Sequence, residues 1–340
     1  MQDTNPPGSA LSDPSFSLTH SLHEVARGAG LDIDFDDLHA TMGLPLMTCA
    51  VRDQPRVDLW LLCARDAFVV PAARLFGMII RELHPPEAAR GLDHAPEFGQ
   101  HFCASYLPLV ERALENNQLV LAWQGWPGEC EHMWGIITGR CESGVGLVGR
   151  IVRPPTASAS TSDLRLVTPP LQLYVVEAMT PAPASAEELL SVALDHARSA
   201  LNNEVGERFG AVTGPGAYDE WIGRLSQDDA GRADDHRRLA ASLIANHESM
   251  IRFLRRSPPG DTPGENMGVP DSKVINELTS ACGTIVSELT TLAKGTPPDE
   301  HLVRSEARKE FISQIERTRE ATLQVRDAIN ATDSPTLPAE

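Results

Sequence analysis

The spacing of apolar residues divides the chain into a mixed first half and a helical second half. Up to about residue 180, stretches with helical spacing alternate with short apolar runs that glycine and proline bound. The expected helices are 17–30, 65–76 and 98–116, and the expected strands are 56–63, 77–83, 118–124, 132–138, 144–152 and 171–178. Residues 155–162 are expected to form a loop. This mixture predicts an α+β domain with a mixed or antiparallel sheet.

Beyond residue 185 the apolar residues recur almost everywhere at helical spacing. Ser185 and Glu188 have the spacing of a capping box, which predicts a helix that reaches about residue 203. Three further helices are expected at 233–256, 271–294 and 298–330. Amphipathic helices bury their apolar faces against one another or against a neighbouring domain. We therefore expect an α-helical domain that covers a cleft in the first domain or forms a homodimer.

The sequence TPAPAS at residues 180–185 is the strongest linker signal in the chain. Four segments follow from it and from the composition of the two ends: a disordered N-terminus at 1–14, an α+β domain at 15–180, a helical domain at 185–332 and a flexible tail at 333–340.

Composition excludes several classes of partner. The formal net charge of −18 opposes binding to nucleic acid or to anionic membranes, and 41% hydrophobic residues can form a substantial core. The first residues lack the basic and apolar regions of a signal peptide, so the expected location is cytoplasmic. The six cysteines include no Cys-x-x-Cys pair, and we expect them to be reduced.

Candidate chemistry is concentrated in residues 117–139. Two apolar runs are joined there by a Trp-Pro-Gly turn, and His132 stands at the beginning of the second run. A histidine that a strand holds at this position is suited to act as the general base for a nucleophile.

An N-terminal helix that ends in glycine, a mixed middle region and the sequence QLVLAW…HMWGIITG together resemble papain-like cysteine enzymes. The similarity is to bacterial peptidase-C39-like proteins and BtrH-type acyltransferases, and it covers roughly residues 15–180. It implies a nucleophile at the start of the first helix, where the helix dipole favours a thiolate. It also implies a histidine at the start of a strand and an Asp or Asn that orients the imidazole.

Carried over to this chain, the resemblance assigns the position of the family cysteine to Ser17, with Ser15 and Thr19 as alternatives. His132 matches the family histidine, and no cysteine precedes Cys49. The glutamine that the family places ahead of the nucleophile, where it helps to bind the oxyanion, is absent.

The orienting group is not assigned, because no Asp or Asn follows within the next strand and Asp163 lies after a long loop. The missing thiol predicts a catalytically degenerate papain-like domain that binds a small molecule or a peptide in its cleft. The alternative is a hydrolase or acyltransferase with Ser17 as nucleophile and His132 as general base.

Simpler roles compete with these assignments. Ser17 could be an ordinary N-cap, and His132 could be a hairpin histidine without a chemical role. Trp123, Trp126 and Trp134 could line a ligand-binding pocket or pack in the core, and Trp126 is expected to be the most exposed of the three.

No metal and no cofactor are expected. Structural zinc requires four ligands, whereas the sequence offers only small groups: Cys130 and His132 with Cys141, His20 with His23, and His101 with Cys103. His236 and His247 are three helical turns apart, and we expect both to lie at the surface or in an interface.

Overall fold

The computed structural model describes residues 14–51, 66–84, 97–141, 146–152, 161–181, 184–204, 211–226, 232–257, 272–297, 302 and 306–332. The chain forms two compact units that are interleaved in sequence. Met1–Leu38 and Val69–Pro183 make up the first unit, and His39–Phe68 and Ala184–Glu340 make up the second. The fold class is α+β with a helical C-terminal part, as predicted. Residues 39–68, which we expected in the first domain, cluster with the second unit.

Several predictions concern residues outside this description. They are the strand at 56–63, the tail at 333–340, residues 155–160 of the loop expected at 155–162, and the N-terminal segment 1–14, of which only Pro14 is described. The last two residues of that expected loop are in a strand, so the loop prediction is wrong there.

The first unit is built on a six-stranded antiparallel sheet with the strand order β2-β7-β3-β4-β5-β6. The strands are β2 (Met78–Glu82), β3 (Leu119–Trp123), β4 (Trp134–Arg140), β5 (Leu147–Ile151), β6 (Thr161–Arg165) and β7 (Gln172–Met179). Five of them lie where the apolar runs predicted strands. The strand β6 was missed because its sequence, TSDLR, is mostly polar, and it lies at the edge of the sheet.

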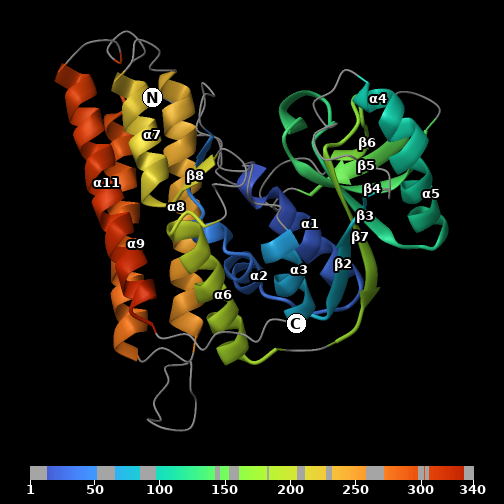
Figure 1. Ribbon diagram of the computed structural model, residues 1–340, viewed down its shortest axis with the longest axis horizontal. Helices are drawn as coiled ribbons and strands as arrows, with labels where there is room; N and C mark the ends of the chain where they lie inside the picture. The colour runs from blue at the N-terminus through green and yellow to red at the C-terminus, as the bar shows by residue number, and fades with distance from the viewer. Residues whose placement is uncertain are drawn as a thin grey trace, which may run out of the picture. The chain divides into compact units, whose positions relative to one another are not determined.

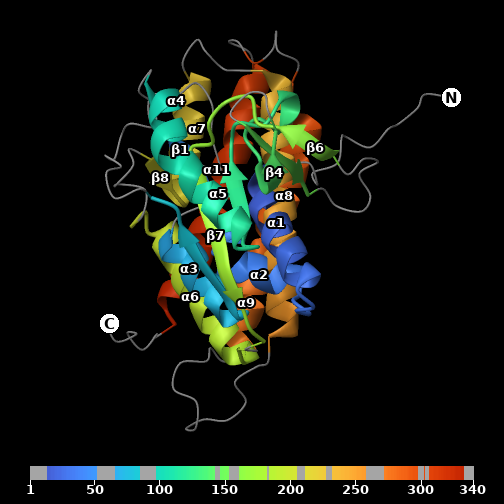
Figure 2. The same ribbon diagram turned by 90° about the vertical axis from the view of Figure 1, so that its right-hand side faces the viewer.

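Helices cover both faces of this sheet. Helix α1 (Pro14–Gly28) contacts β4 on one face, and α4 (Phe98–His101) and α5 (Leu107–Glu115) lie over the other (Figures 1 and 2). A π-helical turn, Phe102–Tyr106, joins α4 to α5. Val120 and Ala122 of β3 share a core cluster with Phe102 and Val110 from this helical segment. Helix α3 (Asp66–Leu75) begins in the second unit and ends in the first.

The second unit contains long helices that run side by side (Figure 1). They are α6 (Ala186–Leu201), α7 (Pro215–Ser226), α8 (Ala233–Arg256), α9 (Ser272–Gly295) and α11 (Glu306–Asn330). Helix α9 packs on both α8 and α11, and α11 also packs on α7. The predicted capping box is confirmed: the Ser185 hydroxyl accepts the Glu188 N–H, and the Glu188 carboxylate accepts the Ser185 N–H. No helix in the described ranges combines the length and hydropathy needed to cross a bilayer.

A buried segment from the first part of the chain completes the second unit. We call residues 39–51 the strap. It comprises the end of α2 (Phe35–Thr41), a 3₁₀ turn (Leu44–Leu46) and β1 (Cys49–Val51), which pairs antiparallel with β8 (Ala211–Thr213). Every residue from 38 to 50 is buried.

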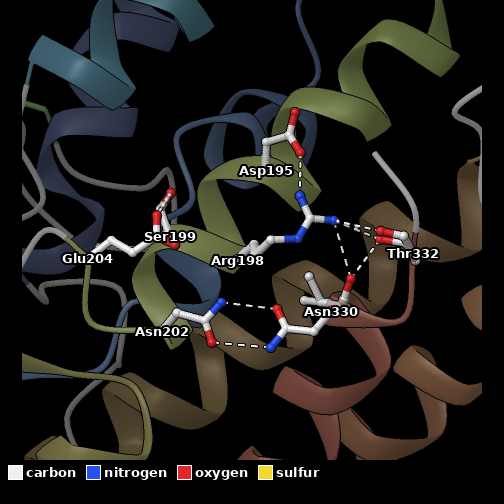
Figure 3. Close-up of polar contacts among 8 residues, drawn as sticks. Asp195, Arg198, Ser199, Asn202, Glu204, Asn330 and Thr332 are labelled. Carbon is white, nitrogen blue, oxygen red and sulfur yellow. Dashed lines mark hydrogen bonds and ion pairs between the residues drawn. The ribbon is translucent and has the colours of Figure 1, made fainter. Parts of the chain in front are cut away.

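The C-terminal ends of α6 and α11 are joined by polar contacts (Figure 3). The Arg198 guanidinium donates to the carbonyl oxygens of Ile329 and Thr332, each at 3.2 Å, and to the Thr332 hydroxyl at 2.8 Å. The side-chain amides of Asn202 and Asn330 donate to each other at 3.0 and 3.2 Å. A cation at the last carbonyls of a helix also complements the helix dipole, so this contact stabilises the end of α11.

Trp126 is fully buried, so the prediction that it is the most exposed tryptophan is wrong. Its indole lies over Gly135 and Gly149, where an added Cβ would come within 2.6 and 2.8 Å of the ring. The indole N–H donates to the Ala122 carbonyl at 3.3 Å. Two glycines on adjacent strands therefore create the space in which a residue of the turn enters the core.

Replacing Gly135 should test this packing. In Gly135→Ala the new methyl group would clash with Trp126 and with Ile151, and we expect the free energy of unfolding in urea to fall by about 2–3 kcal/mol. The control is Gly139→Ala in the same strand, whose Cβ would make ordinary contact with Val148 at 3.6 Å. Equal stability of the two variants would contradict the packing.

Candidate functional site

The start of helix α1 is held against strand β4 by two serines. The Ser17 hydroxyl accepts the backbone N–H of Trp134 at 2.9 Å, and the Ser21 hydroxyl, one turn later, donates to the Trp134 carbonyl at 3.5 Å. Both serines are completely buried. The helix begins at Pro14, so Ser17 lies inside it and the N-cap interpretation is wrong. The start of α1 is thus in contact with the strand that begins two residues after His132.

The structure tells less about the other candidate residues, namely the alternative nucleophiles and the candidate orienting acid. Thr19 is buried like Ser17. The side chains of Ser15 and Asp163 lie outside what the structure describes.

His132 is an exposed residue of the turn that precedes β4. Its Nδ1 lies 3.1 Å from Nε2 of Gln124, and its carbonyl accepts the Trp123 indole N–H at 3.2 Å. An amide nitrogen only donates hydrogen bonds, so Nδ1 is the acceptor in this contact.

Gln124 was not predicted to belong to the site. Its backbone is left-handed, with a φ of 66°, and its N–H donates to the Met133 carbonyl at 3.2 Å. Gly125 follows with a φ of 84°, so the chain turns through two consecutive left-handed residues. In the sequence, the Gln-Gly pair at the end of β3 indicates a turn. It does not indicate that the glutamine contacts a histidine.

The three tryptophans do not share one surface. Trp123 and Trp134 are directly opposite each other on β3 and β4, and Trp134 stacks on Tyr174 with ring centroids 5.4 Å apart. Trp126 belongs to the core on the opposite face of the sheet. All three are buried, which favours a packing role.

A polar chain on β2 and β7 was also missed. The Gln172 amide donates to the Glu82 carboxylate at 2.9 Å and to the Tyr174 hydroxyl at 3.1 Å. His84 contacts the other oxygen of Glu82 at 2.9 Å. Gln172 and Tyr174 are two residues apart, as are Glu82 and His84, but only the pairing of the two strands, with Glu82 opposite Tyr174, brings these pairs together.

His20 lies on α1 one turn after Ser17 in an aromatic environment. Its ring centroid is 4.6 Å from that of Phe35 and 6.4 Å from that of Phe16. Burial, reinforced by the nearby His23, lowers the pKa of His20 to about 4. No described group forms a hydrogen bond with its buried Nε2. This histidine is therefore neutral in the folded protein near neutral pH.

Metal binding finds no support in the described ranges, where no three His, Cys, Asp or Glu side chains are grouped to hold an ion. The candidate groups around Cys130 and Cys141, His20 and His23, and His101 and Cys103 gain no further ligand among these residues.

No protein-family model matches the chain, and no curated protein matches its sequence.

Removing the Ser17 hydroxyl should weaken the fold measurably. In Ser17→Ala the Trp134 N–H loses its acceptor in a buried position, and we expect a loss of about 1–3 kcal/mol in the free energy of unfolding. Ser226→Ala is the control, because that exposed hydroxyl donates only to a carbonyl of its own helix. Equal effects of both changes in urea denaturation would show that the buried hydrogen bond is unimportant.

The pH dependence of stability should reveal His20. The unfolded residue titrates near 6.5 and the folded one near 4, so the unfolded state binds the proton more readily between these values. Stability is then full above about pH 6.5 and falls by up to about 3 kcal/mol as the pH drops towards 4. His20→Phe should remove this part of the loss in urea denaturation at a series of pH values. If the free energy of unfolding depends on pH in the same way in the variant and the wild type, His20 is not the source of the loss.

Proposed function

We propose that the first unit is a catalytically degenerate papain-like domain that serves as a binding module for a small molecule or a peptide. One observation carries the proposal: Ser17, at the position that the resemblance gives to the nucleophile, is completely buried and its oxygen accepts the Trp134 N–H. A nucleophile must reach the substrate carbonyl, and a hydroxyl enclosed between a helix and a strand does not.

The state of His132 supports the same conclusion. A serine hydroxyl is a weak nucleophile until a base removes its proton. Nδ1 of His132 accepts the Gln124 amide, whereas the Ser17 oxygen accepts the Trp134 N–H, so the two groups have different partners in the structure.

The surface available to a ligand is the turn between β3 and β4. Glu129, Glu131 and His132 are exposed there, beside the partly exposed Gln124. Two carboxylates next to an imidazole favour a ligand with positive charge or several N–H donors. A lysine- or arginine-containing peptide has this chemistry.

The absence of catalysis can be tested on the intact chain with a fluorophosphonate probe and an alkyl thioester. We expect peptide mapping by mass spectrometry to find no adduct on Ser17. In Ser17→Cys the introduced thiol should resist iodoacetamide in native buffer and react in denaturant, because the position is buried. The exposed Cys103 should react in native buffer and provides the internal control.

An adduct on Ser17 that disappears in His132→Ala would overturn this proposal. That result would establish the alternative, a hydrolase or acyltransferase with Ser17 as nucleophile and His132 as base.

Binding can be tested by NMR with short peptides that contain lysine or arginine. We expect such peptides to shift the signals of the His132 imidazole and the Gln124 amide. Glu129→Gln with Glu131→Gln should weaken the effect by removing two exposed carboxylates. If no peptide shifts these signals, the turn is not a peptide-binding surface.

A further inference from the structure

The strap packs against elements that follow much later in the chain. Its 3₁₀ turn lies on α6 and α8, and β1 lies on α7 and pairs with β8. These elements all belong to residues 184–340, whereas the strap belongs to residues 1–183. The backbone connects these two parts once, through the linker at 180–185. The strap is therefore a second connection between them, and this one is noncovalent.

Hydrogen bonds attach the first half of the strap to two of the helices. Nε2 of His39 lies 2.7 Å from Oδ1 of Asn246 on α8. Nδ1 of His196 on α6 donates to the Thr41 carbonyl at 2.6 Å. Both contacts are specific in direction, so they fix where the strap lies along α6 and α8.

The second half of the strap adds a strand to β8. The two strands form a three-residue antiparallel ladder, and just before it the Thr48 carbonyl accepts the Gly214 N–H at 2.9 Å. Backbone pairing of this kind, combined with buried side chains, is how many proteins bind an extended segment of another chain.

Long apolar side chains of the strap are buried. At most 4% of the residue is exposed in Met42, Leu44, Leu46 and Met47. Because the turn Leu44–Leu46 packs on α6 and α8, these helices remove its apolar surface from water. The same contact covers the apolar side chains that the helices turn towards the strap.

The fit is closest at Gly43. A Cβ on this residue would lie only 2.9 Å from the Cβ of His196. Gly43 also has a φ of 70°, a left-handed conformation that glycine adopts without steric cost. The strap and α6 are thus complementary in shape at the level of a single methyl group.

We propose that residues 184–340 form a binding surface for an apolar segment that ends in a strand, and that the strap of the same chain is its occupant. The two parts, 1–183 and 184–340, then remain bound to each other after the linker is cut. This interaction is distinct from the ligand binding proposed for the turn between β3 and β4 and does not depend on it.

The test uses the full chain with a protease site inserted between Pro183 and Ala184, which is cut after the protein has folded. We expect the two pieces to elute together in size-exclusion chromatography at a concentration of about 1 μM. Separation of the pieces under these conditions would overturn the proposal.

Two glycine substitutions show whether the strap is responsible for the association. In the cut chain, Gly43→Ala should raise the dissociation constant of the two pieces at least about tenfold, because the new methyl group meets His196. Gly30→Ala is the matched control, since Gly30 is also left-handed, with a φ of 79°, but a Cβ there has no neighbour within 4 Å. Equal dissociation constants in the two variants would contradict the role of the strap.

A disulfide bond tests the position of the strap without weakening it. Cys49 is directly opposite Thr213, next to the hydrogen-bonded pair of Thr48 and Gly214. The Cα atoms of such a neighbouring pair are about 4.5 Å apart, which a disulfide can bridge. In Thr213→Cys, oxidation should join the two pieces of the cut chain into one band on a nonreducing denaturing gel.

Cys49→Ser in the Thr213→Cys background is the control, and it should leave two bands. Pieces that stay separate after oxidation of Thr213→Cys would show that the strap is not on β8, and the proposal would be wrong. A disulfide-linked dimer of the uncut Thr213→Cys chain would identify a second copy as the source of the strap and would also overturn it.

Discussion

A polar group removed from water must find a partner inside the protein, and this constraint determines how distant parts of the chain are held together. The Trp134 N–H takes the Ser17 hydroxyl as its acceptor, which fixes α1 on the sheet. In the second unit, Asn246 pairs with the buried His39, and the Thr41 carbonyl accepts a hydrogen bond from the half-buried His196. The polar residues that looked most suited to chemistry are thus occupied with structural tasks.

The same constraint accounts for the partners of the two residues that the sequence analysis singled out. A buried hydroxyl near the start of a helix is tolerated when it finds a hydrogen-bond partner. Ser17 finds one in the backbone of the adjacent strand, and Gln124 provides one for His132. Each of the two residues thus has a partner within the fold.

Periodicity was sufficient for the elements that are long or strongly apolar. The helix expected at 233–256 has those bounds in the structure. Each end of β3 lies one residue from its expected position, and each end of β4 lies two residues from it. The strands β1 and β8 were missed because each has three residues and gains its identity only from a partner far along the chain. Trp126 was misplaced for a related reason, since the space for its ring is made by glycines on two later strands. In the same way, Ser17 and His132 could be identified from the sequence, but their partner atoms could not.

The depth at which the strap is buried has a consequence for biosynthesis. The hydrogen bond between His39 and Asn246 cannot form until Asn246 has been synthesised, 207 residues later. At typical translation rates this gap corresponds to roughly 10–40 s on the ribosome. During that time the Leu, Met and Pro side chains of the strap are exposed on the nascent chain, because the helices that bury them have not all been synthesised. A chaperone that shields this run would therefore act on the growing chain well before release.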